Sequence, residues 1–316
     1  MGGSSYDRDV YSSSSSSSGG WGTSTVSTAK LKQYTMDPAM NPKGKVIRST
    51  SKNPIIVMLD VTGSNINFAR LVYDKLPMFY GQIEQKGYLD DFDISICAVG
   101  DAYTDKYPLQ VSDFARGLEL DSWMEKLVLE GNGGGQCKES YELAAYYLLK
   151  MAEFDSDATP VVFFIGDESP YPRVDIDQAK SFDIPIKKSI DPFSDLRKKF
   201  NDNVYMLLNK YGGGFRDHIT KSWTRRLAPE HVIMINEEKA IIDLMLGILA
   251  IMSRKSLKTY ALDMKDRGQT DLRIEGVTQS LQGLSTALVP MEHFKTSLPT
   301  SQAGNTGKDG KKGKRL

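Results

Sequence analysis

Five short apolar runs, separated by stretches with helical spacing, constrain the fold of this 316-residue chain more than any other feature. Most of the runs are β-branched and nearly continuously apolar, as expected for strands covered on both faces of a parallel sheet. Strands that alternate with helices predict a doubly wound, mostly parallel α/β sheet with helices on both faces. The runs span residues 55–59, 92–99, 161–165, 204–208 and 231–235, and the helical patterns span about 66–86, 113–127, 139–153, 192–201, 215–226 and 237–253.

The two ends of the chain differ in composition from its middle. The Ser- and Gly-rich residues 1–53 and the Lys-rich residues 301–316 each carry a net charge of +4, although the whole chain is neutral. Residues 54–300 therefore carry about −8. We expect a disordered basic tail over 1–53, a folded domain over 54–262, and a C-terminal extension over 263–316 that ends in a second disordered basic tail. A short apolar stretch at 126–129 could add an edge strand to the sheet.

Cysteine content and hydropathy favour a cytoplasmic protein. The two cysteines, Cys97 and Cys137, exclude a scaffold of several disulfides and fit a reducing compartment. The most apolar run, residues 240–252, is too short to span a bilayer and contains Asp243. The first residues lack the apolar core of a secretory signal. We expect no membrane contact, and nucleic acid could bind only through the basic tails.

Oxygen-bearing side chains follow two of the predicted strands at the points where they end. Asp60, Thr62 and Ser64 come after the first strand, and Asp167 comes after the third. Ligands of open α/β sheets bind beyond the carboxyl ends of the strands. If these strands are neighbours across the switch point, the two carboxylates repel each other unless a cation lies between them or one is protonated. Such oxygen ligands suit a hard divalent cation such as Mg²⁺.

Three further residues are candidates for the metal site or its rim. Gln136 ends a pliable glycine-rich loop, GNGGGQ, whose glycines allow a close approach to the site. Glu168 directly follows Asp167. Asp101 follows the second predicted strand, where a turn or helix-capping role explains it better than a position on the rim.

These elements together resemble the von Willebrand factor A (vWA) domain family with its metal-ion-dependent adhesion site (MIDAS). Asp60, Thr62 and Ser64 look like the DxSxS or DxTxS element of that family. The GGGQ loop lies about seventy residues further on, like the family's middle loop, and Asp167 matches the Asp that follows the fourth strand. The resemblance covers residues 54 to about 254 and is greatest to intracellular members of the family.

The resemblance implies a non-enzymatic adaptor or scaffold that binds another protein in a cation-dependent way. Asp60, Thr62, Ser64 and Asp167 would hold Mg²⁺ or Mn²⁺, directly or through water. An acidic side chain of the protein partner would complete the coordination. Gln136 departs from the Thr or Asp that is usual in the middle loop, which would weaken metal binding. A vWA scaffold with an empty metal site is therefore one alternative.

A second alternative is an enzyme. Asp60 also begins a motif similar to the DKTGT element of P-type ATPases, in the haloacid dehalogenase superfamily, where the Asp is the phosphorylated nucleophile and a later Asp, here Asp167, binds Mg²⁺. The sequence shows no transmembrane region and no cap insertion near Asp60, and it has several strand and helix units after Asp167. We therefore predict a protein that is not an enzyme, with phosphotransfer as the alternative.

Overall fold

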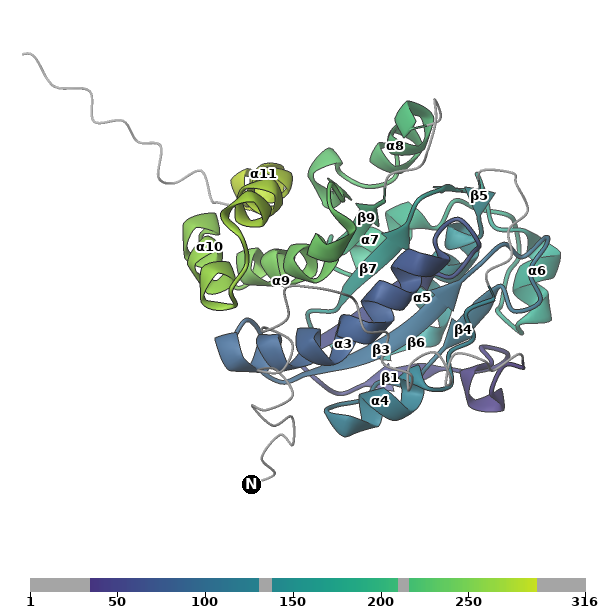
Figure 1. Cartoon of the computed structure of the whole chain (residues 1–316). Helices are drawn as coiled ribbons and strands as arrows, with labels where there is room; N and C mark the ends of the chain where they lie inside the picture. The colour runs from purple at the N-terminus through teal and green to yellow at the C-terminus, as the bar shows by residue number, and fades with distance from the viewer. Residues whose placement is uncertain (1–34, 131–137, 210–215, 289–316) are drawn as a thin grey trace, which may run out of the picture.

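The computed structural model describes residues 35–130, 138–209 and 216–288, and its centre is a six-stranded sheet with helices on both faces (Figure 1). The strand order is β10-β9-β7-β2-β3-β4, in which β4 runs antiparallel to β3 and all other neighbours are parallel. The predicted doubly wound, mostly parallel α/β fold is confirmed. The strands are β2 (Asn53–Asp60), β3 (Phe92–Val99), β4 (Leu109–Val111), β7 (Val161–Gly166), β9 (Val204–Leu208) and β10 (Val232–Met234).

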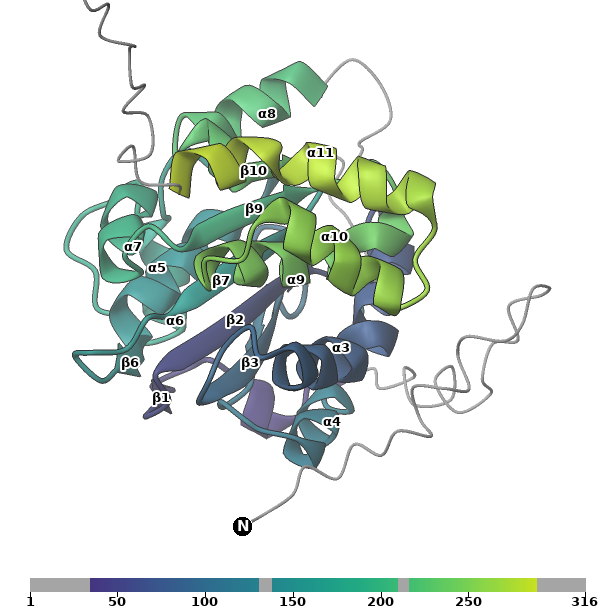
Figure 2. The same ribbon diagram turned by 90° about the vertical axis from the view of Figure 1, so that its left-hand side faces the viewer.

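Each central strand is buried on both faces because its residues alternate between two helical layers. In β2, Val57 lies in the core on one side of the sheet and Met58 lies in the core on the other side. This two-sided burial is the physical reason for the continuous apolar runs in the sequence. Figure 2 shows both layers. The first contains α3 (Ile66–Lys86), α4 (Leu118–Met124), α9 (Ile241–Met252), α10 (Leu257–Asp266) and α11 (Asp271–Leu288), and the second contains α5 (Tyr141–Met151), α6 (Ile176–Ser181), α7 (Phe193–Lys199) and α8 (Arg216–Thr224).

Helix α9 is buried around its whole circumference because the sheet covers one side and α10 and α11 cover the other. Gly247 allows the close approach of these helices, since a Cβ at this position would lie only 2.8 Å from the ring of Tyr260. The sequence placed residues 263–316 in a C-terminal extension, and within it α11 is an 18-residue helix that packs on α9. No helix in the described part of the chain is long and apolar enough to cross a membrane.

The segment ahead of β2 lies along the sheet, although the sequence placed residues 1–53 in a tail. It contains the 3-10 helix η1 (Pro38–Met40) and the strand β1 (Ile47–Ser49), which pairs in parallel with β6 (Ala152–Phe154). Met40 and Ile47 are fully buried in the two cores. These two apolar side chains hold the segment against the domain.

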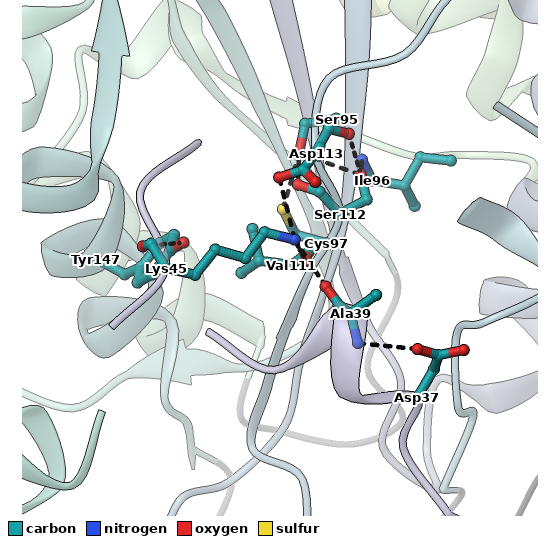
Figure 3. Close-up of polar contacts among 10 residues, drawn as sticks. All are labelled: Asp37, Ala39, Lys45, Ser95, Ile96, Cys97, Val111, Ser112, Asp113 and Tyr147. Atoms are coloured by element: carbon teal, nitrogen blue, oxygen red, sulfur yellow. Dashed lines mark hydrogen bonds and ion pairs between the residues drawn. The ribbon is translucent and has the colours of Figure 1, made fainter. Parts of the chain in front are cut away.

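Lys45 connects this segment to the edge of the sheet (Figure 3). Its Nζ donates hydrogen bonds to the carbonyl oxygens of Ala39 at 2.7 Å and Val111 at 2.9 Å, and it lies 3.2 Å from a carboxylate oxygen of Asp113. Val111 belongs to β4, so the segment covers an otherwise open edge strand.

The edge strand predicted at 126–129 is wrong, because β4 occupies that edge. The Gln110 side chain replaces strand pairing there: its Nε2 donates to the Val128 carbonyl at 2.8 Å, and its Oε1 accepts from the Val128 N–H at 2.9 Å. Val128 is therefore buried and hydrogen-bonded without being a strand residue. The remaining short elements are β5 (Lys138–Glu139), β8 (Ser169–Pro170), η2 (Pro229–His231) and η3 (Glu238–Ala240).

Candidate metal site

Asp60 and Asp167 lie at the carboxyl ends of two neighbouring strands. In the parallel pair of β2 and β7, Leu59 is opposite Ile165, so Asp60 lies beside Gly166. The strand order reverses between these two strands, because the chain continues from β2 to β3 on one side and from β7 to β9 on the other. The two strands are thus neighbours across the switch point, where ligands of this fold class bind.

Gly166 makes the close approach of the two strand ends possible. A Cβ at this position would overlap the hydroxyl of Tyr141 and would lie 2.9 Å from both Cβ and Oδ2 of Asp60. Any larger residue would displace Asp60 or Tyr141. The glycine before Asp167 therefore belongs to the construction of the site.

The carboxylate of Asp60 is fully buried and both of its oxygens accept hydrogen bonds. Oδ1 accepts from the Thr62 hydroxyl at 2.6 Å and from the Thr62 N–H at 2.9 Å, and Oδ2 accepts from the Tyr141 hydroxyl at 2.6 Å. Burial raises the pKa of Asp60, although the hydrogen bonds from Thr62 and Tyr141 lower it. Because both oxygens are engaged, Asp60 would act on a cation through water and through its charge.

Ser64 and Asp167 join the two loops that follow β2 and β7. The Ser64 hydroxyl donates to Asp167 Oδ1 at 3.3 Å. Asp167 is buried, and burial, together with the charge of Asp60, raises its pKa to about 7. Ser64 is exposed, so this side of the group faces solvent. The structure therefore brings together the four residues that the sequence proposed as metal ligands, as two hydrogen-bonded pairs, Asp60 with Thr62 and Ser64 with Asp167.

The three proposed rim residues have different positions. Glu168 is buried beside the site, and burial, followed by the charges of nearby carboxylates, raises its pKa to about 7. Asp101 accepts hydrogen bonds from the Tyr103 N–H and the Tyr171 hydroxyl, each at 3.1 Å, so its carboxylate stabilises a turn after β3. Gln136 lies outside the residues that the structure describes.

Glu139 and Tyr141 belong to the surroundings of the site, and the sequence analysis missed both. It assigned residues 139–153 to one helix, whereas β5 at 138–139 precedes α5. The parallel pairing of β5 with β8 brings Glu139 close to the loop that holds Asp167. Burial, followed by the charges of Asp60 and Glu168, raises the pKa of Glu139 to about 11. The only signal in the sequence was the polar pair Glu139 and Ser140 directly before an apolar helix.

The residues present fit a hard divalent cation that keeps part of its water shell. No ion pair with Lys or Arg involves Asp60, Asp167 or Glu139 in the described residues, so no basic side chain there balances these acids. One oxygen of Glu139, Oε2, is buried without a hydrogen-bond partner in the same ranges. Within 35–130, 138–209 and 216–288, no three His, Cys, Asp or Glu side chains form a group that could hold a metal ion. A cation would therefore depend on the hydroxyls of Thr62 and Ser64 and on water.

The similarities of this chain to known proteins lie in its structure. No protein-family model matches the sequence, and a search of the curated proteins finds no match. Among solved structures, the pilus adhesin SpaC from Lactobacillus rhamnosus GG matches with a TM-score of 0.45 and 10% identity, over 66% of this chain and 31% of SpaC. Proximal thread matrix protein 1 from the mussel byssus, in a structure with a zinc-occupied MIDAS motif, matches with a TM-score of 0.42 and 11% identity, over 65% of this chain and 49% of that protein.

The chain thus spans about a third to a half of the length of these proteins. Their TM-scores lie below 0.5, and the strand order and strand directions of this chain define its fold without them.

Proposed function

We propose that this protein is a non-enzymatic adaptor or scaffold of the vWA type that binds another protein through Mg²⁺ or Mn²⁺ at the carboxyl ends of β2 and β7. The observation that carries the proposal is the meeting of the Asp60–Thr62 and Ser64–Asp167 pairs at the switch point of the sheet. These are the residues that resemble the MIDAS element in the sequence. When bound, the cation supplies the positive charge that attracts an oxygen ligand from a partner.

The chain's own residues divide the work of holding the cation. Ser64 is exposed and donates a hydrogen bond to the buried Asp167, and both side chains offer oxygens to the cation. Thr62 orients Asp60 through its hydroxyl, and Asp60 contributes charge from a fully buried position. Two carboxylates match the charge of a divalent cation, so a partner's Asp or Glu side chain can still bind as a further ligand.

Phosphoryl transfer is less well supported than binding. A nucleophilic Asp must reach a phosphorus atom with a free carboxylate oxygen. Both oxygens of Asp60 are occupied, by Thr62 and by Tyr141, and the side chain has no exposed surface. A phosphatase assay of the wild type and of Asp60→Ala tests this alternative directly, since turnover that disappears in the variant would identify a phosphotransferase.

Thermal denaturation with Mg²⁺ alone tests the cation site. At ten times its dissociation constant, Mg²⁺ should stabilise the wild type by about 1.4 kcal/mol, or about 2–4 °C in Tm. Asp60→Ala and Asp167→Asn should lose this shift. Asp177→Asn is the matched control, because Asp177 is an exposed acid whose side chain is 96% exposed. An Mg²⁺ shift that is unchanged in Asp60→Ala would contradict the proposal.

Affinity capture tests the binding of a protein partner. A partner captured by the wild type should be released by EDTA and should bind again after Mg²⁺ or Mn²⁺ is added. Asp60→Ala should capture none, and acidic side chains of the partner should be required. Capture that EDTA leaves unchanged would favour a scaffold with an empty metal site. The cytoplasmic location stays a prediction from the sequence.

A further inference from the structure

Glu139 is a buried acid that the four proposed ligands do not explain. It lies in β5 opposite Pro170 of β8, on the segment that follows Asp167. The N–H of the next residue, Ser140, donates to the carbonyl of Gly100 just after β3, at 3.1 Å. The backbone at Glu139 is thus fixed from two sides, beside the loops that carry the proposed site.

A hydrogen bond of Tyr141 shows how close this segment comes to the proposed site. The hydroxyl of Tyr141 donates to Asp60 Oδ2 at 2.6 Å. Glu139 lies two residues before Tyr141 and is only 3% exposed. The Glu139 side chain is therefore enclosed near Asp60 and does not extend into solvent.

The environment of Glu139 lacks a group that would stabilise its charge. In the described ranges its Oε2 has no hydrogen-bond partner. After burial, the groups that raise its pKa most strongly are all acids: Asp60, Glu168, Asp101 and Asp105. An enclosed carboxylate without a partner is unfavourable. Its position is explained if a positive charge from outside the protein completes the group.

We infer that Glu139 is the third carboxylate of the proposed cation site and that its Oε2 accepts a hydrogen bond from a water molecule bound to the cation. The inference rests on the proposed function. Contact through water fits because Asp60, Asp167 and Glu139 do not form a group that could hold a metal ion directly. Mg²⁺ and Mn²⁺ sites of this kind retain waters, and a carboxylate that orients a metal-bound ligand strengthens metal binding.

A third carboxylate affects the cation and the partner in opposite ways. Its negative charge attracts the cation, so it should increase the affinity for Mn²⁺. The same charge repels an anionic ligand, so it should reduce the affinity of the loaded site for a partner carboxylate. Glu139 would therefore favour a firmly bound cation that releases its acidic ligand readily.

A titration of the full-length protein with Mn²⁺, followed by the electron paramagnetic resonance signal of free Mn²⁺, tests the first effect. Glu139→Gln, which keeps the shape of the side chain, should weaken Mn²⁺ binding about tenfold. Asp60→Ala should abolish it. Glu142→Gln is the matched control, because Glu142 is equally buried but its Oε2 already accepts the Tyr171 N–H at 2.9 Å. Its Mn²⁺ affinity should stay within about twofold of wild type.

Acetate tests the second effect, as a carboxylate probe for the loaded site. At saturating Mn²⁺, acetate binding is followed by the displacement of metal-bound water in proton relaxation measurements. Glu139→Gln should bind acetate several-fold more tightly than the wild type. Local damage to the structure would weaken Mn²⁺ and acetate binding together, so the opposite directions identify the effect of charge.

The outcomes separate this inference from the proposed function. If Asp60→Ala loses Mn²⁺ while Glu139→Gln binds it as the wild type does, the cation site stands and the role of Glu139 is overturned. If Glu139→Gln weakens both Mn²⁺ and acetate, the role of its charge is likewise overturned. If the wild type and Asp60→Ala bind Mn²⁺ equally, or neither binds it, the cation site itself is refuted and the inference with it.

Discussion

Two groups of buried charge in this molecule are built in opposite ways. Between α9 and the end of α10, Asp243 lies 2.8 Å from a guanidinium nitrogen of Arg267, and both side chains are less than 10% exposed. At the ends of β2 and β7, Asp60 and Asp167 are equally buried but have no basic partner in the described residues. Among the described residues, a basic side chain balances the buried acid of the helical layer but not the buried acids at the end of the sheet.

The pKa shifts express this difference. Burial raises the pKa of Asp243, but the charge of Arg267 lowers it again. Burial also raises the pKa of Asp167, and there the charge of Asp60 raises it further. The second contribution thus has opposite signs in the two groups. A buried acid with a basic partner has its charge balanced within the protein, whereas buried acids without one are candidates for a functional site, in keeping with the proposed cation site.

The largest effect is expected where the internal pair is broken. Arg267→Met should reduce the free energy of unfolding by about 3–5 kcal/mol, because it leaves Asp243 buried and uncompensated. The Tyr260 hydroxyl would also lose the hydrogen bond that it accepts from Arg267 at 3.2 Å. Urea denaturation in the absence of metal measures the change.

Arg197→Met is the matched control, because the pair of Arg197 with Asp202 is partly exposed at 31% and 61%. It should change the free energy of unfolding by no more than about 1 kcal/mol. Equal losses in the two variants would mean that burial does not distinguish these ion pairs.

The next effect concerns the tight packing at the proposed cation site. Gly166→Ala should destabilise the protein by about 1–3 kcal/mol and should weaken Mg²⁺ binding, because the added methyl group displaces Tyr141 and Asp60. Gly276→Ala in α11 is the control, since a Cβ there meets nothing within 4 Å. It should stabilise the protein by about 0.5–1 kcal/mol. Urea denaturation of both variants decides, and stabilisation by Gly166→Ala would contradict the described packing.

The sequence was sufficient to predict the central sheet and the meeting of Asp60 with Asp167. The apolar runs of β2 and β7 are continuous because helices cover both faces, and residues at the ends of adjacent parallel strands must meet. The local apolar pattern and the general topology of parallel sheets were therefore enough for these two predictions.

Features that depend on contacts between distant segments could not be predicted. The sequence pattern predicted that Glu139 begins a helix. Its burial comes instead from the pairing of the two-residue strand β5 with β8, which the local sequence does not indicate. The apolar residues 126–129 were predicted to form a strand. Nothing in the sequence shows that the Gln110 side chain makes the hydrogen bonds to the backbone N–H and carbonyl of Val128. Arg267 lies 24 residues after Asp243, and its pairing with that acid requires the position of α10 on α9.

The next effect concerns pH. Asp167 and Glu168 have pKa values of about 7 in the folded protein, compared with ordinary values of 3.8 and 4.5. Between these values the folded state holds more protons than the unfolded state, so the free energy of unfolding falls as pH rises. Without metal, each of these two acids would lower the free energy of unfolding by up to about 2 kcal/mol between pH 5.5 and pH 8.

Urea denaturation at the two pH values, with EDTA and then with Mg²⁺, measures this effect. Mg²⁺ should reduce the loss, because it binds the ionised carboxylates. Asp167→Asn should show a weaker dependence on pH than the wild type. Stability of the metal-free wild type that rises over this range would show that these acids are balanced by charges within the protein.

The smallest effect is expected at an exposed ion pair. This pair tests whether burial contributes more to the stability of an ion pair than a short distance between its charges does. Nε of Arg48 in β1 lies 2.6 Å from Oε2 of Glu153 in β6, but the two side chains are 66% and 55% exposed. Arg48→Ala should change the free energy of unfolding by less than about 1 kcal/mol, because water screens the pair. Ile47→Ala, at the buried neighbouring position, should cost about 2–5 kcal/mol. If urea denaturation instead shows a loss for Arg48→Ala as large as that for Arg267→Met, the distance between charges, and not their removal from water, would determine which pairs stabilise this fold.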